Sequence, residues 1–407
     1  MRPLRPLPRL LPDLRRARDR DGLAARADLP DQVARGGPDR ARRRDGAPPR
    51  AVPGLPRVRD RLPGGRALRP AHRGGEGRAR AAAPGRSRAA RVPLAQLRRA
   101  PHEPAALRAY QESGLGRLVR ASGLARRLPG PLAAWEALLP ALPRAAERAP
   151  LPPLIPAAGA RRARVALLAG CVQSVLFGAH NRATARVLAR QGCEVVVPAA
   201  QGCCGALSAH GGEHAGALEL ARRTIAAFEA ARADAVVVNT SGCGAHMKAY
   251  GHLLADDPAW AERARRFAAS VVDVAEFLAR EPLRGPLAPV SLTVTYHDPC
   301  HVVHGQKIRS EPRRLLAQIP GLSVVELAES DWCCGSAGLY NLTQPEMATR
   351  LRERKVGHVL ATGAEAVVTA NPGCILQIQA GLAARGAPLR VLHLVEVLDR
   401  AYPADGP

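Results

Sequence analysis

Eight of the nine cysteines in this 407-residue sequence follow a pattern that suits metal binding. Two stand side by side before a glycine in QGCCG (201–205), and two more do so in DWCCG (331–335). A vicinal pair supplies two sulfur ligands from one tight turn, and the glycine lets the backbone pass close to a bulky inorganic group. The pattern favours a metal site, although a single free cysteine usually packs like a small hydrophobic residue.

The eight cysteines form two sets of four, with equivalent members 129 to 131 positions apart along the chain. The first set is Cys171, Cys203, Cys204 and Cys243, and the second is Cys300, Cys333, Cys334 and Cys374. A nearly constant offset of this kind indicates an internal duplication. Four thiolates suit either an iron–sulfur cluster or a tetrahedral zinc ion.

The ninth cysteine, Cys193, has no counterpart in the second half, and we expect it to be a core residue at the start of a strand. Disulfides are not expected, because the N-terminus lacks the apolar segment of a secretory signal peptide. No run of about 18 uncharged apolar residues is present, so no transmembrane segment is predicted. These features predict a cytoplasmic protein.

Short runs rich in β-branched residues lead to the cysteines, and longer amphipathic segments separate the runs. Strands are predicted at 164–170, 193–198, 234–244, 291–300, 322–329 and 364–374, and helices at 174–192, 213–232, 313–319 and 345–363. The alternation predicts an α/β fold of two duplicated lobes with parallel strands and the cysteines at the carboxyl ends of the strands. We expect a helical linker at 101–160, a first cysteine-rich domain at 161–285 and a second at 286–407.

Several polar residues accompany the cysteines, and each has both a functional and a structural interpretation. His246, His297 and His301 either donate hydrogen bonds to sulfur or are ordinary loop residues. Asn239 and Asn371 are predicted to form turns. Asp331 and Trp332 either cover the second site or pack locally.

The N-terminal hundred residues have a different composition from the rest of the chain. They contain 27 Arg, no Lys and 9 acidic residues, so they carry +18 of the net charge of +25. They lack Cys, Phe, Trp, Tyr, Ile, Asn and Thr, and Pro and Gly recur too often for long helices. We predict that residues 1–100 are disordered, because such a composition cannot offset the entropy lost on ordering.

Three origins of this segment remain open. It is a disordered basic tail, a tail that binds nucleic acid or anionic lipid, or an out-of-frame translation of a GC-rich gene. We favour the third, and we expect no nucleic-acid partner, since the remaining 307 residues carry only +7.

The sequence resembles a known family from about residue 105 to residue 404. The repeated Cys…CCG…GC pattern resembles the CCG domain of heterodisulfide-reductase-type electron carriers. The stretches that carry the closer resemblance, to the iron–sulfur subunit of glycolate oxidase (glycolate dehydrogenase), are HDPCHVVHGQKIRSEPRRLL, DWCCGSAGLYNLTQPEMATRL and VVTANPGCILQIQAGL. The full motif ends in C-x-x-C, but here Thr240 and Asn371 replace the earlier cysteine of that pair.

The resemblance implies an electron-transfer subunit without a catalytic site of its own. Partner subunits that carry FAD would oxidise glycolate to glyoxylate, and this subunit would pass the electrons towards the quinone pool at the inner face of the plasma membrane. Family members begin with a ferredoxin-like domain, whereas no cysteine precedes Cys171 here. An out-of-frame segment in its place would make the product defective as written.

Two other functions are consistent with the same residues. One is an iron–sulfur subunit of a lactate or glycerol-3-phosphate dehydrogenase, because the substrate would bind to the flavin subunit. The other is a zinc-stabilised scaffold without redox activity.

Overall fold

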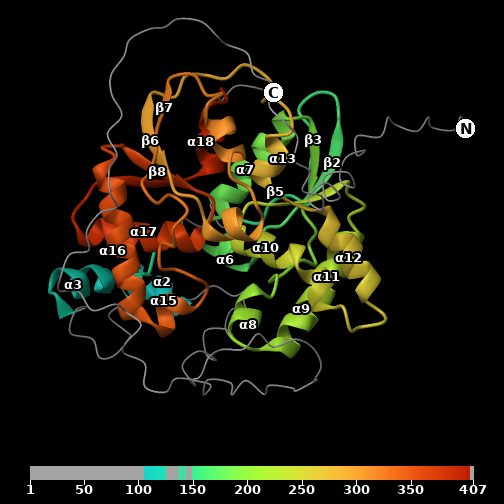
Figure 1. Ribbon diagram of the computed structural model, residues 1–407, viewed down its shortest axis with the longest axis horizontal. Coiled ribbons are helices and arrows are strands. Elements are labelled where there is room, and N and C mark those ends of the chain that lie inside the picture. The colour runs from blue at the N-terminus through green and yellow to red at the C-terminus, as the bar shows by residue number, and fades with distance from the viewer. Residues whose placement is uncertain (1–104, 125–135, 137, 141, 144–148, 404–407) are drawn as a thin grey trace, which may run out of the picture. The chain divides into compact units, whose positions relative to one another are not determined.

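The computed structural model describes residues 105–124, 136, 138–140, 142, 143 and 149–403 (Figure 1). The prediction of disorder for residues 1–100 lies outside this part of the chain. Two helices, α2 (Ala105–Glu112) and α3 (Leu115–Ala121), precede the cysteine-containing region. No helix in the described ranges is both long and apolar enough to cross a membrane.

Two separate sheets confirm the predicted α/β fold with parallel strands. The first has the order β1-β3-β2-β4-β5, and only β1 is antiparallel to its neighbour. Its strands are β1 (Leu154–Ile155), β2 (Ala163–Leu167), β3 (Cys193–Val196), β4 (Ala235–Val238) and β5 (Val271–Asp273). The second has the order β7-β6-β8-β9 and is wholly parallel. Its strands are β6 (Leu292–Tyr296), β7 (Leu322–Val325), β8 (Ala366–Thr369) and β9 (Arg390–His393).

The two sheets share one topology, as the cysteine register predicts. The order β3-β2-β4-β5 in the first lobe corresponds to β7-β6-β8-β9 in the second. In the first lobe the chain goes from β2 to β3 on one side and then to β4 and β5 on the other side. In the second lobe it goes from β6 to β7 and then to β8 and β9 in the same way. Such a switch in strand order opens a crevice outside the carboxyl ends of the strands, where ligands of α/β proteins bind.

Helices follow almost every strand, and most predicted elements are present with shorter bounds. The helices of the first lobe are α6 (Cys171–Leu176), α7 (Gly178–Arg190), α8 (Ala206–His210), α9 (His214–Glu229), α10 (Ser241–Lys248), α11 (Tyr250–Leu253), α12 (Ala261–Ser270) and α13 (Val274–Leu278). Those of the second are the π-helix η3 (His301–Gly305), α14 (Glu311–Leu316), α15 (Tyr340–Thr343), α16 (Pro345–Ala361), α17 (Pro372–Ala384) and α18 (Leu394–Arg400).

One helix that was predicted as continuous is divided into two in the structure. Residues 174–192 were expected to form a single helix, but Phe177 adopts φ −133° and ψ 35° and separates α6 from α7. The ring of Phe177 stacks on His180 at a centroid distance of 5.0 Å. Helix α6 begins at Cys171, at the end of the loop that follows β2.

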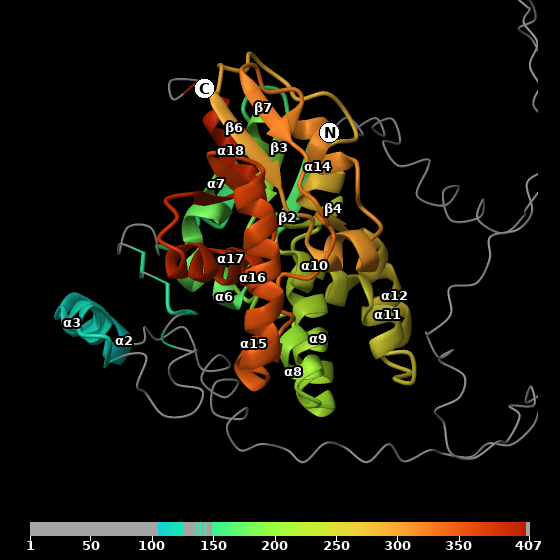
Figure 2. The same ribbon diagram turned by 60° about the vertical axis from the view of Figure 1, so that its left-hand side comes forward.

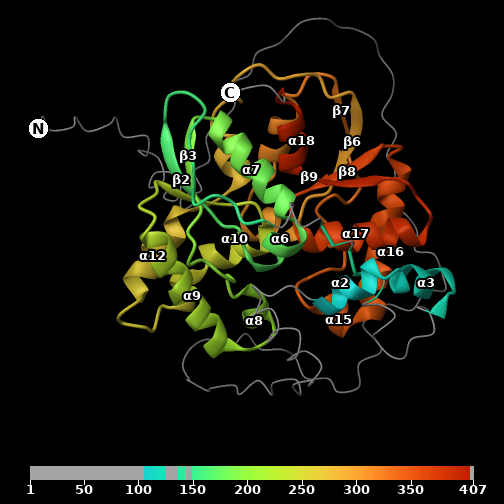
Figure 3. The same ribbon diagram turned by 180° about the vertical axis from the view of Figure 1, so that it is seen from behind.

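The two lobes share a central hydrophobic core. Helices α7 and α18 pack against each other between the strands of the two sheets (Figures 1 and 3). Strand residues alternate between cores: Val165 and Leu167 face this shared core, whereas Ala166 faces a second core against α9 and α12. A third core lies between the second sheet and helices α16 and α17, and α16 runs across the front of Figure 2.

Candidate metal centres at the strand ends

The first set of cysteines gathers at the carboxyl ends of three strands. Cys171 opens α6 after β2, Cys203 and Cys204 lie in the loop after β3, and Cys243 lies in the first turn of α10 after β4. This placement follows from the topology, because neighbouring parallel strands bring their carboxyl ends to one edge.

Contacts between the sulfur groups link the first set into a chain. Hydrogen bonds from Cys171 and Cys204 lower the pKa of Cys203 to about 3, against the effect of burial. The backbone N–H of Gly205 donates to the same sulfur at 3.4 Å. Hydrogen bonding to Cys203 raises the pKa of Cys171 and of Cys204 well above the ordinary value, and burial adds to both. Cys204 also contacts Cys243, so all four side chains meet.

The second set forms the same chain of contacts. Hydrogen bonds from Cys300 and Cys334 lower the pKa of Cys333 to about 2, and the backbone N–H of Gly335 donates to its sulfur at 3.3 Å. Donation from Cys334 also lowers the pKa of Cys374 well below its ordinary value, although burial acts in the opposite direction. The sulfur groups of each set thus lie within hydrogen-bonding reach of one another, and a bound metal would take the place of the protons between them.

The glycine after each vicinal pair is required by the backbone. Gly205 has φ +87° and Gly335 has φ +92°, a region that residues with a Cβ atom rarely adopt. A Cβ atom on Gly335 would lie 2.3 Å from the backbone oxygen of Ala348 in α16. On Gly205 the nearest atom, the backbone oxygen of Ala217 in α9, would be 3.3 Å away.

The segments that carry the two sets lie close to each other. The backbone N–H of Ser241 in α10 donates to the oxygen of Ala370 at 3.3 Å, and Gln306 donates to the oxygen of Ser241 at 3.2 Å. The rings of His210 and His301 lie edge to face at 5.9 Å. The two candidate centres are thus neighbours across the boundary between the lobes.

The three histidines near the cysteines have different surroundings. His301 Nδ1 lies 3.5 Å from the sulfur of Cys300. His246 is near Cys203, and burial lowers the pKa of His246 to about 4. His297 follows β6 beside Cys300 in sequence, but its ring lies with Cys334 and Cys374, and the three potential ligand atoms are all within 4.8 Å of one another.

The two asparagines were expected to form turns, and the structure gives them more specific contacts. Asn371 precedes α17, and its side-chain amide donates to the sulfur of Cys374 at 3.4 Å. Asn239 is buried and donates to Asn181 and to Thr184, both at 2.9 Å. The turn interpretation missed these contacts, because partners on other elements decide what a short polar side chain does.

Cys193 is a core residue, as predicted. It lies at the start of β3 and is 3% exposed, and burial raises its pKa to about 11. This cysteine therefore packs within the core shared by the lobes and does not join the first set.

Asp331 and Trp332 make local contacts near the second set. Trp332 is 48% exposed, and the guanidinium of Arg354 lies over its ring at 4.7 Å. Asp331 pairs with Arg309 at 3.4 Å. These contacts fit the packing interpretation.

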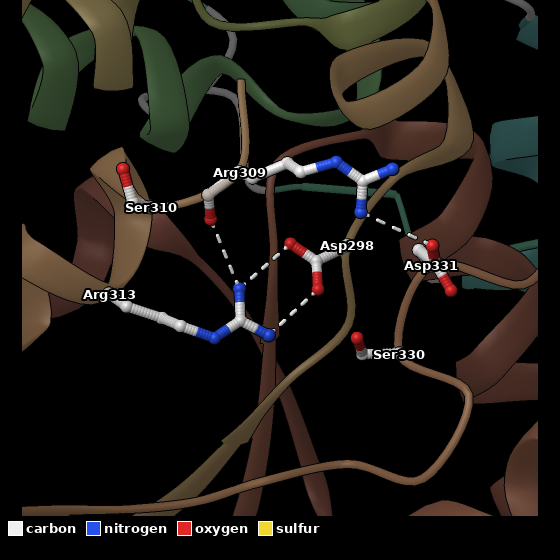
Figure 4. Close-up of a pocket in the computed structure, with 6 residues that line it drawn as sticks. All are labelled: Asp298, Arg309, Ser310, Arg313, Ser330 and Asp331. Carbon is white, nitrogen blue, oxygen red and sulfur yellow. Dashed lines mark hydrogen bonds and ion pairs between the residues drawn. The ribbon is translucent and has the colours of Figure 1, made fainter. Parts of the chain in front are cut away.

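A surface pocket lies beside the second set (Figure 4). It is lined by Asp298, Arg309, Ser310, Arg313, Ser330 and Asp331. Arg313 donates to both carboxylate oxygens of Asp298, at 3.0 and 2.8 Å. Arg309 pairs with Asp331 and Arg313 with Asp298, so both arginines that line the pocket are neutralised by acidic residues that line it too. The second pair also fixes Asp298, the residue next to His297.

Comparison with known proteins matches three segments of the chain. Residues 165–248 and 294–379 each match the family described as a cysteine-rich domain, and residues 105–139 match the linker region of the glycolate oxidase iron–sulfur subunit. The two cysteine-rich matches contain all eight cysteines of the two sets.

Three relatives give the extent of the similarity. A probable glycolate oxidase iron–sulfur subunit of Bacillus subtilis is 41% identical over 293 residues, which cover 71% of this chain and 66% of that protein. The glycolate oxidase iron–sulfur subunit of Escherichia coli is 37% identical over 255 residues, 62% of this chain and 60% of the relative. Lactate utilization protein A of an Exiguobacterium species is 33% identical over 236 residues, 58% of this chain and 96% of the relative.

The chain belongs to the family of glycolate oxidase iron–sulfur subunits. The family that the sequence motifs indicated is therefore confirmed. The chain spans about two thirds of the Bacillus relative and 60% of the Escherichia one.

Sequence reasoning missed one charged residue at the second centre of this family member. Lys355 in α16 is 2% exposed, and its ammonium group donates to the backbone oxygens of Glu329 and Ser330, the latter at 3.3 Å. Burial lowers the pKa of Lys355, while the nearby Cys334 acts in the opposite direction. The sequence did contain a signal for this residue, because Lys355 stands among the apolar positions of the amphipathic helix predicted at 345–363.

Proposed function

We propose that this chain is the iron–sulfur electron-transfer subunit of a multisubunit, flavin-dependent glycolate dehydrogenase. The observation that carries the proposal is the convergence of two sets of four cysteine side chains at equivalent strand ends, each inside one matched cysteine-rich domain. On this proposal the eight cysteines of the two sets are the ligands.

The donor set fits an iron–sulfur cluster. Thiolate sulfur is the donor that such clusters take, and the cysteines are buried or half-buried. Cys243 and Cys374 lie in the first turns of α10 and α17, where the helix dipole and free N–H groups stabilise negative charge. A bound [4Fe–4S] cluster would supply one-electron chemistry, and the chain's own contribution is ligation, burial and N–H···S hydrogen bonding.

The closeness of the two centres supports electron transfer through the chain. Contacts from α10 to Ala370 and from Gln306 to Ser241 hold the two cysteine-bearing edges together. We propose that electrons enter from partner subunits that carry FAD and leave towards the quinone pool. The subunit would then work in the cytoplasm, against the inner face of the plasma membrane.

Metal analysis of the anaerobically purified chain tests the cofactor. We expect iron and acid-labile sulfide with visible absorption, whereas a colourless protein that holds only zinc would refute the redox function in favour of a scaffold. Cys171→Ser and Cys300→Ser should each lose the iron of one centre. Cys193→Ala is the matched control, because that thiol lies in the core, and it should keep all the iron.

A second substrate is favoured by one comparison. The lactate utilization relative matches this chain over 96% of its own length, whereas the glycolate oxidase relatives match over shorter fractions. Copurification with flavin subunits, followed by rapid mixing with glycolate or lactate, distinguishes the two. We expect glycolate to bleach the iron–sulfur absorption faster, and faster bleaching by lactate would overturn the choice of substrate.

A further inference from the structure

His297 is held in a single orientation at the second centre. Its ring is 1% exposed, and Nδ1 lies 3.0 Å from the backbone oxygen of Ser330. The same oxygen accepts hydrogen bonds from the backbone N–H of Asp298 at 3.1 Å and from Lys355 at 3.3 Å. Figure 4 shows Arg313 paired with both carboxylate oxygens of Asp298, the residue that follows His297.

These contacts determine which ring nitrogen carries the proton. A carbonyl oxygen only accepts, so Nδ1 must be the donor towards Ser330. In the neutral ring, Nε2 then carries a lone pair and no proton. Nε2 makes no hydrogen bond of normal geometry among the described residues, but the ring lies within hydrogen-bonding reach of Cys374 and beside Cys334.

A buried lone pair that faces two sulfur atoms needs a proton or a metal ion between them. Metal-binding histidines typically show this arrangement, in which one ring nitrogen donates to a backbone carbonyl and the other binds the metal. We propose that His297, through Nε2, is a direct iron ligand of the second centre, which is therefore bound by nitrogen and sulfur. This inference rests on the proposed iron–sulfur function.

The first lobe has no equivalent of this ligand. The 129-residue offset places Leu168, an apolar residue 2% exposed, at the position of His297. Lys355 also lacks a charged counterpart. The backbone oxygen of Ala217 lies next to Gly205 as that of Ala348 lies next to Gly335, so these two alanines are equivalent. Seven residues after each of them stand Thr224 in the first lobe and Lys355 in the second. The duplication has thus produced two centres with different donor sets.

The difference predicts a direction of electron flow. The nearby Lys355 cation favours the reduced, more negative form of the second centre, and the first centre has no charged counterpart. The second centre is therefore the more readily reduced of the two, and electrons move from the first to the second.

Pulsed electron paramagnetic resonance on the reduced full-length protein tests the ligand. With ¹⁵N-histidine incorporated, we expect a nitrogen hyperfine coupling of the strength found for a directly bonded nitrogen. His297→Leu, which copies Leu168, should abolish the coupling while the iron of the first centre remains. His301→Leu is the matched control, since that ring also lies beside a cysteine of the second set, and it should leave the strong coupling unchanged.

A redox titration provides the second measurement. His297→Cys should lower the potential of one centre and leave the other unchanged. Iron in both centres with only a weak coupling would overturn the inference alone and make His297 a hydrogen-bonding neighbour. A wild-type protein without iron would refute the proposed function, and with it this assignment. The labelled wild-type spectrum decides the question even if the variants fail to fold.

Discussion

Replacing Gly335 by alanine should destabilise the second lobe far more than the equivalent change at Gly205 destabilises the first. Both glycines have similar positive φ angles, +92° and +87°, so alanine pays a similar conformational cost of about 1–2 kcal/mol at each. The neighbouring atoms differ. The new Cβ would lie 2.3 Å from the backbone oxygen of Ala348, against 3.3 Å from that of Ala217.

The clash at Gly335 cannot be relieved by a side-chain rotation, because the nearest atom belongs to the backbone of α16. The oxygen of Ala348 also accepts a hydrogen bond from the buried Gln377 at 3.2 Å, so moving it disturbs α17 as well. Overpacking of this kind adds ~1–3 kcal/mol. We therefore expect Gly335→Ala to lose ~2–5 kcal/mol of unfolding free energy and Gly205→Ala only ~1–2 kcal/mol.

Guanidinium unfolding of the reduced, metal-free protein, followed by circular dichroism, measures the difference directly. Iron analysis of the loaded protein adds a second readout, because the Gly335 N–H donates to Cys333 and a shifted turn should empty the second centre only. Equal losses of stability in the two variants would refute the reasoning, since the close contacts with Ala348 and Gln377 distinguish Gly335 from Gly205.

Three further changes have expected outcomes of their own. Asn371→Thr, which copies the residue at the equivalent first-lobe position, removes the amide donor to Cys374 and should lower one reduction potential by about 40 mV in a redox titration, the equivalent of ~1 kcal/mol. Asn239→Leu leaves the buried oxygen of Asn181 without its donor and should lower the unfolding free energy by about 2 kcal/mol in chemical denaturation. Burial raises the pKa of Asp273 to about 6, so the folded protein holds this proton more tightly than the unfolded chain and stability falls as pH rises between about 4 and 6. Asp273→Asn should remove a loss of about 3 kcal/mol in unfolding free energy between about pH 4 and pH 6. Identical curves of unfolding free energy against pH for the variant and the wild type would contradict this prediction.

The positions of the cysteines were largely predictable from the sequence. Runs such as AVVV (235–238) and AVVT (366–369) are strands because they are short, β-branched and followed by turn residues. Once such strands are parallel, their carboxyl ends share one edge, and residues that follow them must gather there. The repeated register then indicated that each lobe gathers its own four cysteines.

The contacts across the lobes were not predictable in the same way. His393 Nε2 lies 2.9 Å from the backbone oxygen of Asn239, a contact between residues 154 positions apart in different lobes. His393 takes the N-cap position that Asp273 has in the first lobe, but a repeat and a periodic pattern describe each lobe by itself and do not predict contacts between lobes. The break at Phe177 was missed for a related reason, since the stacking of its ring on His180 depends on how α7 enters the shared core.

The asymmetry between the two centres follows from how a duplication constrains a sequence. Both copies keep the glycine with positive φ and the cysteines, because the turn and the strand ends demand them. The residue directly after each central strand is free to differ, and it is Leu168 in one lobe and His297 in the other. Leucine completes an apolar wall, whereas the imidazole ring must satisfy two nitrogens in a buried position. The Ser330 carbonyl satisfies one nitrogen, and the other faces the sulfurs of Cys334 and Cys374, where only a proton or a metal ion can complete its bonding.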